Sequence, residues 1–206
     1  MVITRKGPPR EALLVCAVII LVAPVGALAT DDAAGSGEMG PRLQVRAAMM
    51  IHNFTNPGIS LGIDRSIALR GGSEIYVPLN LTFYLHPKNS RVFYLNAGIG
   101  YRLQSRGRFF AAGSLCLGYL HSFVDGDLYT GNGGAVGRVR DHGQAGFMPY
   151  VDLRLGLDRL DGRFRRLAPY VQVMAFGQYP YNGYVLPHFG FQLGTSILLT
   201  GERVPQ

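Results

Sequence analysis

The sequence contains no tryptophan, only two cysteines and few charged residues, which make up 16% of its 206 positions. It also has no long apolar run after its N-terminal region. A helix needs about 18 or more consecutive apolar residues to cross a bilayer, so no later segment can span a membrane as a helix. A bilayer leaves no backbone polar group unpaired, so any later part that lies in a membrane must be a sheet closed on itself.

The N-terminal region has the features of a secretory signal peptide. Three basic residues precede an apolar run over residues 12–25, and Ala29 completes a small-x-small site. These features predict a signal peptide over residues 1–29, cleaved after Ala29. An uncleaved anchor helix is the alternative, but Pro24 and Gly26 interrupt the helix that it would need.

Removal of this peptide changes both the cysteine content and the charge. Only Cys116 would remain, so no internal disulfide could form. The formal net charge falls from +7 to +5, because three basic residues and one acidic residue are lost. Most of the remaining cations are arginines in turns and at the ends of predicted strands, where contact with anionic lipid head groups explains them better than a nucleic-acid partner.

The rest of the chain divides into three parts. Residues 30–41 are small, acidic and without periodicity, which predicts a flexible periplasmic linker. Residues 42–200 are long enough for one domain, and residues 201–206 form a short C-terminal tail.

Between residues 43 and 200 the sequence repeatedly alternates apolar side chains with small, polar or charged ones. The clearest segment, residues 74–86, sets Ile75, Val77 and Leu79 against Tyr76 and Asn80. Eight such segments predict an all-β fold, an eight-stranded antiparallel up-and-down transmembrane β-barrel. The predicted strands are residues 43–52, 59–69, 74–86, 92–103, 109–123, 147–157, 167–178 and 188–200.

The connections and the aromatic residues favour a barrel in a membrane over a soluble barrel of lipocalin type. Residues 70–73 and 160–163 are short turns after even-numbered strands, whereas the longest connection, residues 124–145, follows the fifth and would lie outside the cell. A soluble barrel would place its apolar residues inside and its charges outside, yet few charges occur on any strand. Outward-facing aromatics near the rims fit interfacial girdles: Phe83, Phe93, Tyr101, Phe109, Tyr119, Phe147 and Phe189.

Several short motifs resemble those of a known family. They are NPGISLG (56–62), GYLHSF (118–123), VRDHGQ (139–144), FMP (147–149), APYVQ (168–172) and NGYVLPHFGFQLGT (182–195). Together they resemble a family of small, functionally uncharacterised outer-membrane β-barrel proteins of Bacteroidota-type bacteria. The resemblance implies an outer-membrane barrel and supplies no substrate and no catalytic residue.

All five histidines fall at the predicted extracellular end. Alternation directs His52, His86 and His188 into the lumen, and closure of the barrel makes the first and eighth strands neighbours. A rim site for a metal or for acid–base chemistry is therefore one hypothesis. The preferred interpretation is that these histidines are polar caps bonded to Tyr and Asn, because no ligand spacing such as HExxH occurs. We expect no metal and no other cofactor.

An outer-membrane lipid-modifying hydrolase is the alternative function. The segment from His52 to Asn56 is partly similar to the His-x-Ser-Asn stretch of lipid A deacylases, but an extra residue intervenes, Thr55 replaces the serine and no glutamate partner is evident. His121 and Ser122 are adjacent in a strand, so their side chains point to opposite faces. The weak catalytic candidates are His52, His121 and His188.

Charged residues at inward positions predict a filled lumen. An eight-stranded interior is only wide enough for its own side chains, and isolated buried charges are costly, so we expect an ion-pair network and no open channel. The predicted network is Arg46, Asp64, Arg102, Asp152 and Arg154.

The connection over residues 124–145 is glycine-rich and of mixed charge, which predicts a solvated hairpin with the most freedom to bind a partner. We therefore expect a monomeric structural or surface-interaction protein of the outer membrane. Its extracellular loops would contact lipopolysaccharide or an external partner.

Overall fold

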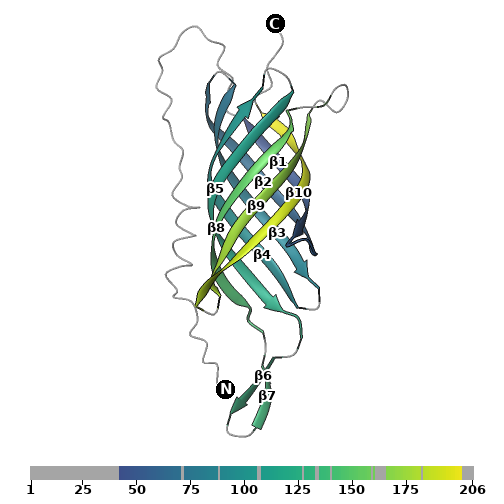
Figure 1. Ribbon diagram of the computed structural model, residues 1–206, viewed down its shortest axis with the longest axis vertical. Coiled ribbons are helices and arrows are strands. Elements are labelled where there is room, and N and C mark those ends of the chain that lie inside the picture. Colours follow the sequence, from purple (N-terminus) through teal and green to yellow (C-terminus); the bar gives the residue numbers. More distant parts are fainter. Residues whose placement is uncertain are drawn as a thin grey trace.

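The computed structural model describes residues 42–70, 72–87, 89–105, 108–126, 128–132, 135–139, 141–158, 160, 166–181 and 183–200 (Figure 1). The predicted signal peptide (1–29), linker (30–41) and C-terminal tail (201–206) lie outside these ranges. No helix in the described ranges has the length and apolar character needed to span a bilayer.

Ten strands make up the described structure, and eight of them form the barrel. All eight predicted strands are present, each with ends equal to the predicted ones or extended by a few residues. The strands are β1 (Leu43–His52), β2 (Asn56–Arg70), β3 (Ser73–His86), β4 (Ser90–Gln104), β5 (Phe109–Val124), β6 (Leu128–Asn132), β7 (Ala135–Val139), β8 (Gln144–Leu157), β9 (Leu167–Tyr181) and β10 (Tyr184–Thr200).

The barrel is an antiparallel up-and-down meander that closes between its first and last strands. Its strand order is β1-β10-β9-β8-β5-β4-β3-β2, so each strand pairs with the next barrel strand along the chain. Closure comes from the β1–β10 register, which runs from Leu43 opposite Thr200 to His52 opposite Gly190. The predicted eight-stranded barrel is confirmed.

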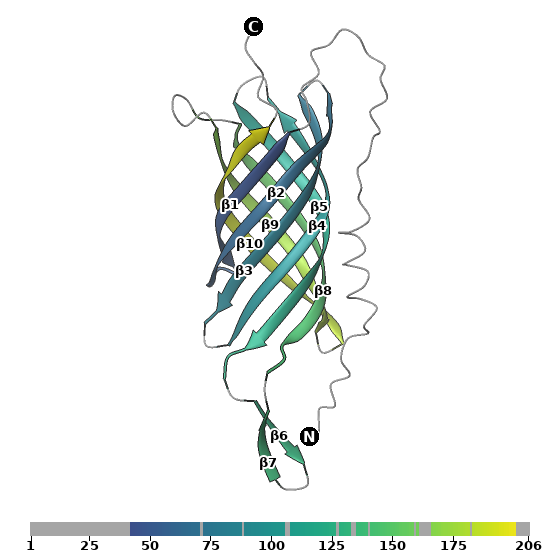
Figure 2. The same cartoon turned by 180° about the vertical axis from the view of Figure 1, so that it is seen from behind.

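Strands β6 and β7 form a separate hairpin between β5 and β8. The hairpin extends past the end of the barrel where β1 ends and β2 begins (Figures 1 and 2). We call this end of the barrel, marked by His52 and Val124, the hairpin end, and the end marked by Leu43 and Thr200 the opposite end.

The two faces of the barrel wall differ sharply in polarity. In β3 the side chains of Leu81, Phe83 and Leu85 are exposed on the outside, whereas Thr82 and Tyr84 are buried in the lumen. Large apolar side chains cover the outside of the other barrel strands in the same way, and the lumen holds most of the buried polar groups. This distribution is the reverse of that in a soluble barrel and is the one that lipid requires.

Candidate functional site

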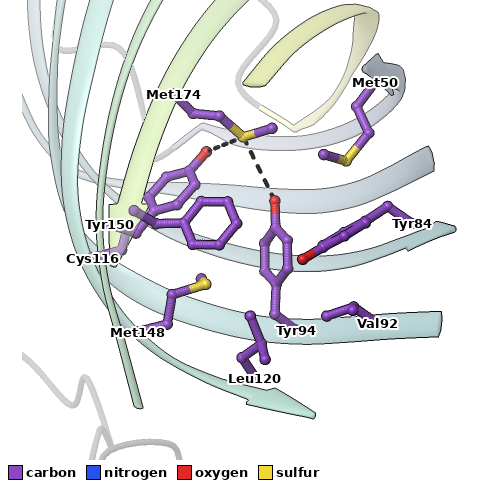
Figure 3. Close-up of a cluster of buried hydrophobic side chains, with 10 residues drawn as sticks. Met50, Tyr84, Val92, Tyr94, Cys116, Leu120, Met148, Tyr150 and Met174 are labelled. Atoms are coloured by element: carbon purple, nitrogen blue, oxygen red, sulfur yellow. Dashed lines mark hydrogen bonds between the residues drawn. The ribbon is translucent and has the colours of Figure 1, made fainter. Parts of the chain in front are cut away.

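The lumen is packed with side chains toward the hairpin end. A hydrophobic cluster, mostly of aromatic and sulfur-containing residues, fills it: Met50, Tyr84, Val92, Tyr94, Cys116, Leu120, Met148, Tyr150, Met174 and Phe176 (Figure 3). The Met174 sulfur accepts hydrogen bonds from the hydroxyls of Tyr94 (3.6 Å) and Tyr150 (3.5 Å). Since these residues come from β1, β3, β4, β5, β8 and β9, they tie the walls of the barrel together.

A charged bridge crosses the lumen beyond this cluster. The Asp64 carboxylate accepts one hydrogen bond from Arg46 Nη2 (2.8 Å) and another from Arg154 Nη1 (2.7 Å). Asp64 lies on β2 and Arg154 on β8, four positions apart in either direction around the ring. All three side chains are buried. The Asp64–Arg154 pair therefore joins opposite walls of the barrel.

Amide and aromatic groups surround the Arg46–Asp64–Arg154 bridge. Arg46 also donates to Asn80, whose own amide donates to Asn96 Oδ1 at 2.7 Å. The Arg154 guanidinium lies 5.3 Å from the centre of the Tyr170 ring. Alternation in the sequence placed Asn80 at an inward position, but neither Asn80 nor Asn96 was assigned to the polar network.

The other two charged residues of the predicted network lie apart from this bridge. Arg102 pairs with Asp158 (2.8 Å) toward the opposite end, and its guanidinium stacks 3.8 Å from the Phe110 ring centre. Asp152 accepts a hydrogen bond from the Ser114 hydroxyl. The five residues thus occupy three neighbouring groups in the lumen. Asp158 follows the last residue of β8, so a strand predicted to stop at residue 157 left it out.

Two predicted histidines meet at the hairpin end of the lumen. His52 Nε2 and His188 Nδ1 lie 2.9 Å apart, and the Asn56 amide nitrogen lies 3.2 Å from His52 Nδ1. The side chains come together because Gly190 is opposite His52 in the β1–β10 register, and His188 lies two residues from Gly190 on the same face. Both are buried, with exposed fractions of 2% and 6%.

Aromatic rings hold both imidazoles in place. The Tyr84 ring stacks on His52 at 4.2 Å between centres, and Phe176 stacks on His188 at 4.7 Å with an interplanar angle of 15°. Neither aromatic residue had been singled out from the sequence, although both lie at inward positions.

The third histidine candidate, His121, lies elsewhere. It stacks on Phe93, an outward-facing residue of β4, at 5.5 Å between ring centres. Its Nδ1 is 2.6 Å from the Tyr119 hydroxyl, and its Nε2 is 3.1 Å from the His142 carbonyl oxygen. His121 therefore belongs to the outer wall of the barrel and shares no site with His52 and His188.

These contacts do not assemble a hydrolase site. Both ring nitrogens of His52 are engaged, by Asn56 and His188, so neither is available to deprotonate a nucleophile. The Thr55 hydroxyl contacts the Asn53 carbonyl and the Asn56 side chain instead of a histidine. Within the described ranges, no group of three or more His, Cys, Asp or Glu side chains has the arrangement to hold a metal ion.

The base of the β6–β7 hairpin is held by a set of polar contacts, which we call the hairpin base. The Asp141 carboxylate accepts from the backbone nitrogens of Val124 (2.6 Å) and Gly143 (2.7 Å). Arg91 pairs with Asp125 at 2.9 Å, and the Asp125 nitrogen donates to the Asn89 carbonyl at 2.9 Å. The two chain segments that leave the barrel wall are thereby fixed to each other and to the β3–β4 turn.

The apolar exterior, the closed ring of eight strands and the filled lumen define a small transmembrane β-barrel. No protein-family model matches the chain, and no curated protein matches its sequence.

Several solved structures are similar in fold. Neisserial surface protein A is 14% identical, with 77% of this chain and 96% of that chain covered and a TM-score of 0.48. Ail, the attachment invasion locus protein of Yersinia pestis, is 7% identical, covers 77% and 97% of the two chains and has a TM-score of 0.46. The outer-membrane enzyme PagL is 12% identical, with 75% of this chain and 98% of that chain covered and a TM-score of 0.45. The narrower assignment to a Bacteroidota-type family stays a prediction.

Proposed function

We propose that the protein is a monomeric barrel of the bacterial outer membrane that anchors and displays the β6–β7 hairpin outside the cell. The hairpin end is then extracellular, and the opposite end faces the periplasm. The lumen serves to brace the walls, because the bridge between Asp64 and Arg154 crosses it and the aromatic cluster fills it.

The hairpin base is the observation that carries this proposal. A flexible surface loop needs no such attachment, whereas Asp141 and Asp125 fix both segments that connect the hairpin to the barrel. A recognition surface that is held in one orientation loses less conformational entropy on binding. The proposed partners are lipopolysaccharide at the membrane surface and an external partner that contacts residues 124–145.

The alternative function, a lipid-modifying hydrolase, gains no support from the geometry. Its strongest candidate, His52, has both ring nitrogens engaged, and His121 lies on the outer wall.

Surface proteolysis of intact cells tests the orientation. Protease added outside should cleave between residues 126 and 141 and leave the barrel strands as two protected fragments, one with β1–β5 and one with β8–β10, because strands in lipid are inaccessible. Cleavage seen only after the outer membrane is permeabilised would contradict the proposed orientation.

Binding to purified lipopolysaccharide tests the interaction role. Barrels embedded in nanodiscs would be compared with a variant in which residues 128–139 are replaced by a short glycine-serine turn, and heat-modifiable gel mobility would show that both are folded. The proposal predicts binding that is lost or much weaker without the hairpin. Equal binding by the two forms would reject the hairpin as the lipopolysaccharide contact.

A further inference from the structure

A directed chain of hydrogen bonds leads from the β1–β2 turn into the lumen. The Asn56 amide nitrogen donates to His52 Nδ1 (3.2 Å), and Asn56 Oδ1 lies 3.2 Å from the Thr55 hydroxyl. His52 must then carry its proton on Nε2, from which it donates to His188 Nδ1 (2.9 Å). As a result, His188 carries its own proton on Nε2.

The chain of hydrogen bonds ends on a donor, His188 Nε2–H, that has no acceptor in the part of the protein that the structure describes. His188 Nε2 is buried and has no hydrogen-bond partner among the residues that the structure describes. A buried N–H without an acceptor is costly and uncommon in native proteins. The side chain cannot easily turn away, because Phe176 stacks on its ring.

The β1–β2 turn, where the chain of hydrogen bonds begins, is strained. Asn53 (φ 46°) and Phe54 (φ 65°) both lie in the left-handed region, although neither is glycine. Backbone strain of this kind persists where the surrounding structure enforces it, and it concentrates at functional sites. The Asn53 side chain holds the turn to β10 by accepting a hydrogen bond from the Phe189 nitrogen at 2.9 Å. The strained turn therefore positions Thr55 and Asn56 for their role in the chain.

We propose that the hairpin end of the lumen contains a binding site for an oxyanion, a carboxylate or phosphate group, with His188 Nε2–H as the donor. An oxyanion supplies the missing acceptor, and a hydrogen bond to an ionised acceptor is the stronger kind. Because Nε2 is covered, a rim side chain must move for the ligand to enter.

The direction of the hydrogen bonds from Asn56 through His52 to His188 excludes a transition metal as the preferred ligand. A metal binds a deprotonated ring nitrogen, whereas Asn56 and His52 together keep the proton on His188 Nε2. Asn56 and Thr55 thus act as positioning residues, and His188 makes the contact with the ligand.

Nitrogen-15 NMR of the histidine rings tests the proposal, with the barrel in a non-ionic detergent that contains no phosphate. In the ligand-free protein the spectrum should show protons on Nε2 of both His52 and His188. Titration with sodium phosphate or sodium acetate at constant ionic strength should then shift the His188 Nε2 signal in a saturable way.

Three variants separate the site from general effects of salt. His188→Phe keeps the stacking on Phe176 and should weaken anion binding by about tenfold or more. Asn56→Leu leaves both rings in place but no longer fixes the tautomers, so part of His188 should become protonated on Nδ1 and the affinity should fall by a smaller factor. His121→Phe, on the outer wall, is the matched control and should bind like the wild type.

A further arm of the experiment distinguishes a free anion from a lipid head group. Nanodiscs would contain lipid A with or without its phosphates, and a shift at His188 that requires the phosphorylated lipid identifies a head group as the ligand. A saturable response in any arm supports the site. A proton on His188 Nδ1 in the wild type, or the absence of a saturable response to phosphate, acetate and phosphorylated lipid, overturns it.

Discussion

Replacing Asp64 by asparagine should strongly destabilise the barrel, because this carboxylate is the ion-pair partner of two guanidinium groups. Asp64 is 5% exposed, and its two oxygens accept from Arg46 and Arg154 at 2.8 and 2.7 Å. Asp64→Asn leaves the buried guanidinium groups of Arg46 and Arg154 without the carboxylate that pairs with both. Breaking a buried ion pair in this way costs about 3–5 kcal/mol of the free energy of unfolding.

Urea titration of the refolded barrel in detergent micelles would measure this loss. Far-UV circular dichroism is the suitable probe, because the chain has no tryptophan for fluorescence. A matched triple variant, Arg46→Met, Asp64→Leu and Arg154→Met, removes all three charges and should recover most of the lost stability. A loss below about 1 kcal/mol for Asp64→Asn, or a triple variant less stable than Asp64→Asn, would refute the reasoning.

Three further substitutions test the turn, the hairpin base and the barrel wall. Phe54→Gly should raise the unfolding free energy by about 1 kcal/mol, because glycine accepts the left-handed conformation; a lower urea midpoint would contradict this. Gly143→Ala adds a Cβ that collides with the His121 ring, and Gly143 has a positive φ that alanine rarely adopts. Protease should therefore cleave the hairpin faster while the urea midpoint of the barrel stays unchanged. An unaltered cleavage rate would count against the role of the hairpin base. Gly98→Val places a Cβ against the Leu115 carbonyl on β5, so it should lower the free energy of unfolding by about 3 kcal/mol or more, or prevent the heat-modifiable form. The lipid-facing control Ala97→Val should fold normally. Equal folding of both variants would contradict the packing.

The strands could be predicted because lipid and lumen impose opposite chemistry on alternate residues. Strand boundaries were missed where neighbouring residues do not differ in polarity. β10 begins at Tyr184 instead of the predicted residue 188, because residues 184–187 are apolar or proline on both faces. The β6–β7 pairing lay inside a connection whose glycine content predicted a hairpin but gave no strand ends.

The site was less predictable because its partners depend on stagger and tilt around the barrel. Closure of the first strand on the last was enough to suggest that His52 and His188 are near each other. The Asp64–Arg154 pair is separated by 90 residues and lies across the lumen, so no local pattern indicates it. Asn56, which fixes the His52 tautomer, is the first residue of β2 and precedes residue 59, where alternation placed the start of that strand.

Solution NMR with lipid-attached radicals tests the central claim, that lipid surrounds the apolar exterior and side chains fill the lumen. In nanodiscs that carry a nitroxide on the lipid acyl chain, the methyl signals of Leu81, Leu117 and Leu153, which are exposed on the outer wall, should broaden strongly. The methyl signals of Leu120, buried in the lumen, should stay sharp. Broadening of Leu120 with protection of the other three would show that the barrel faces are reversed and would contradict the account.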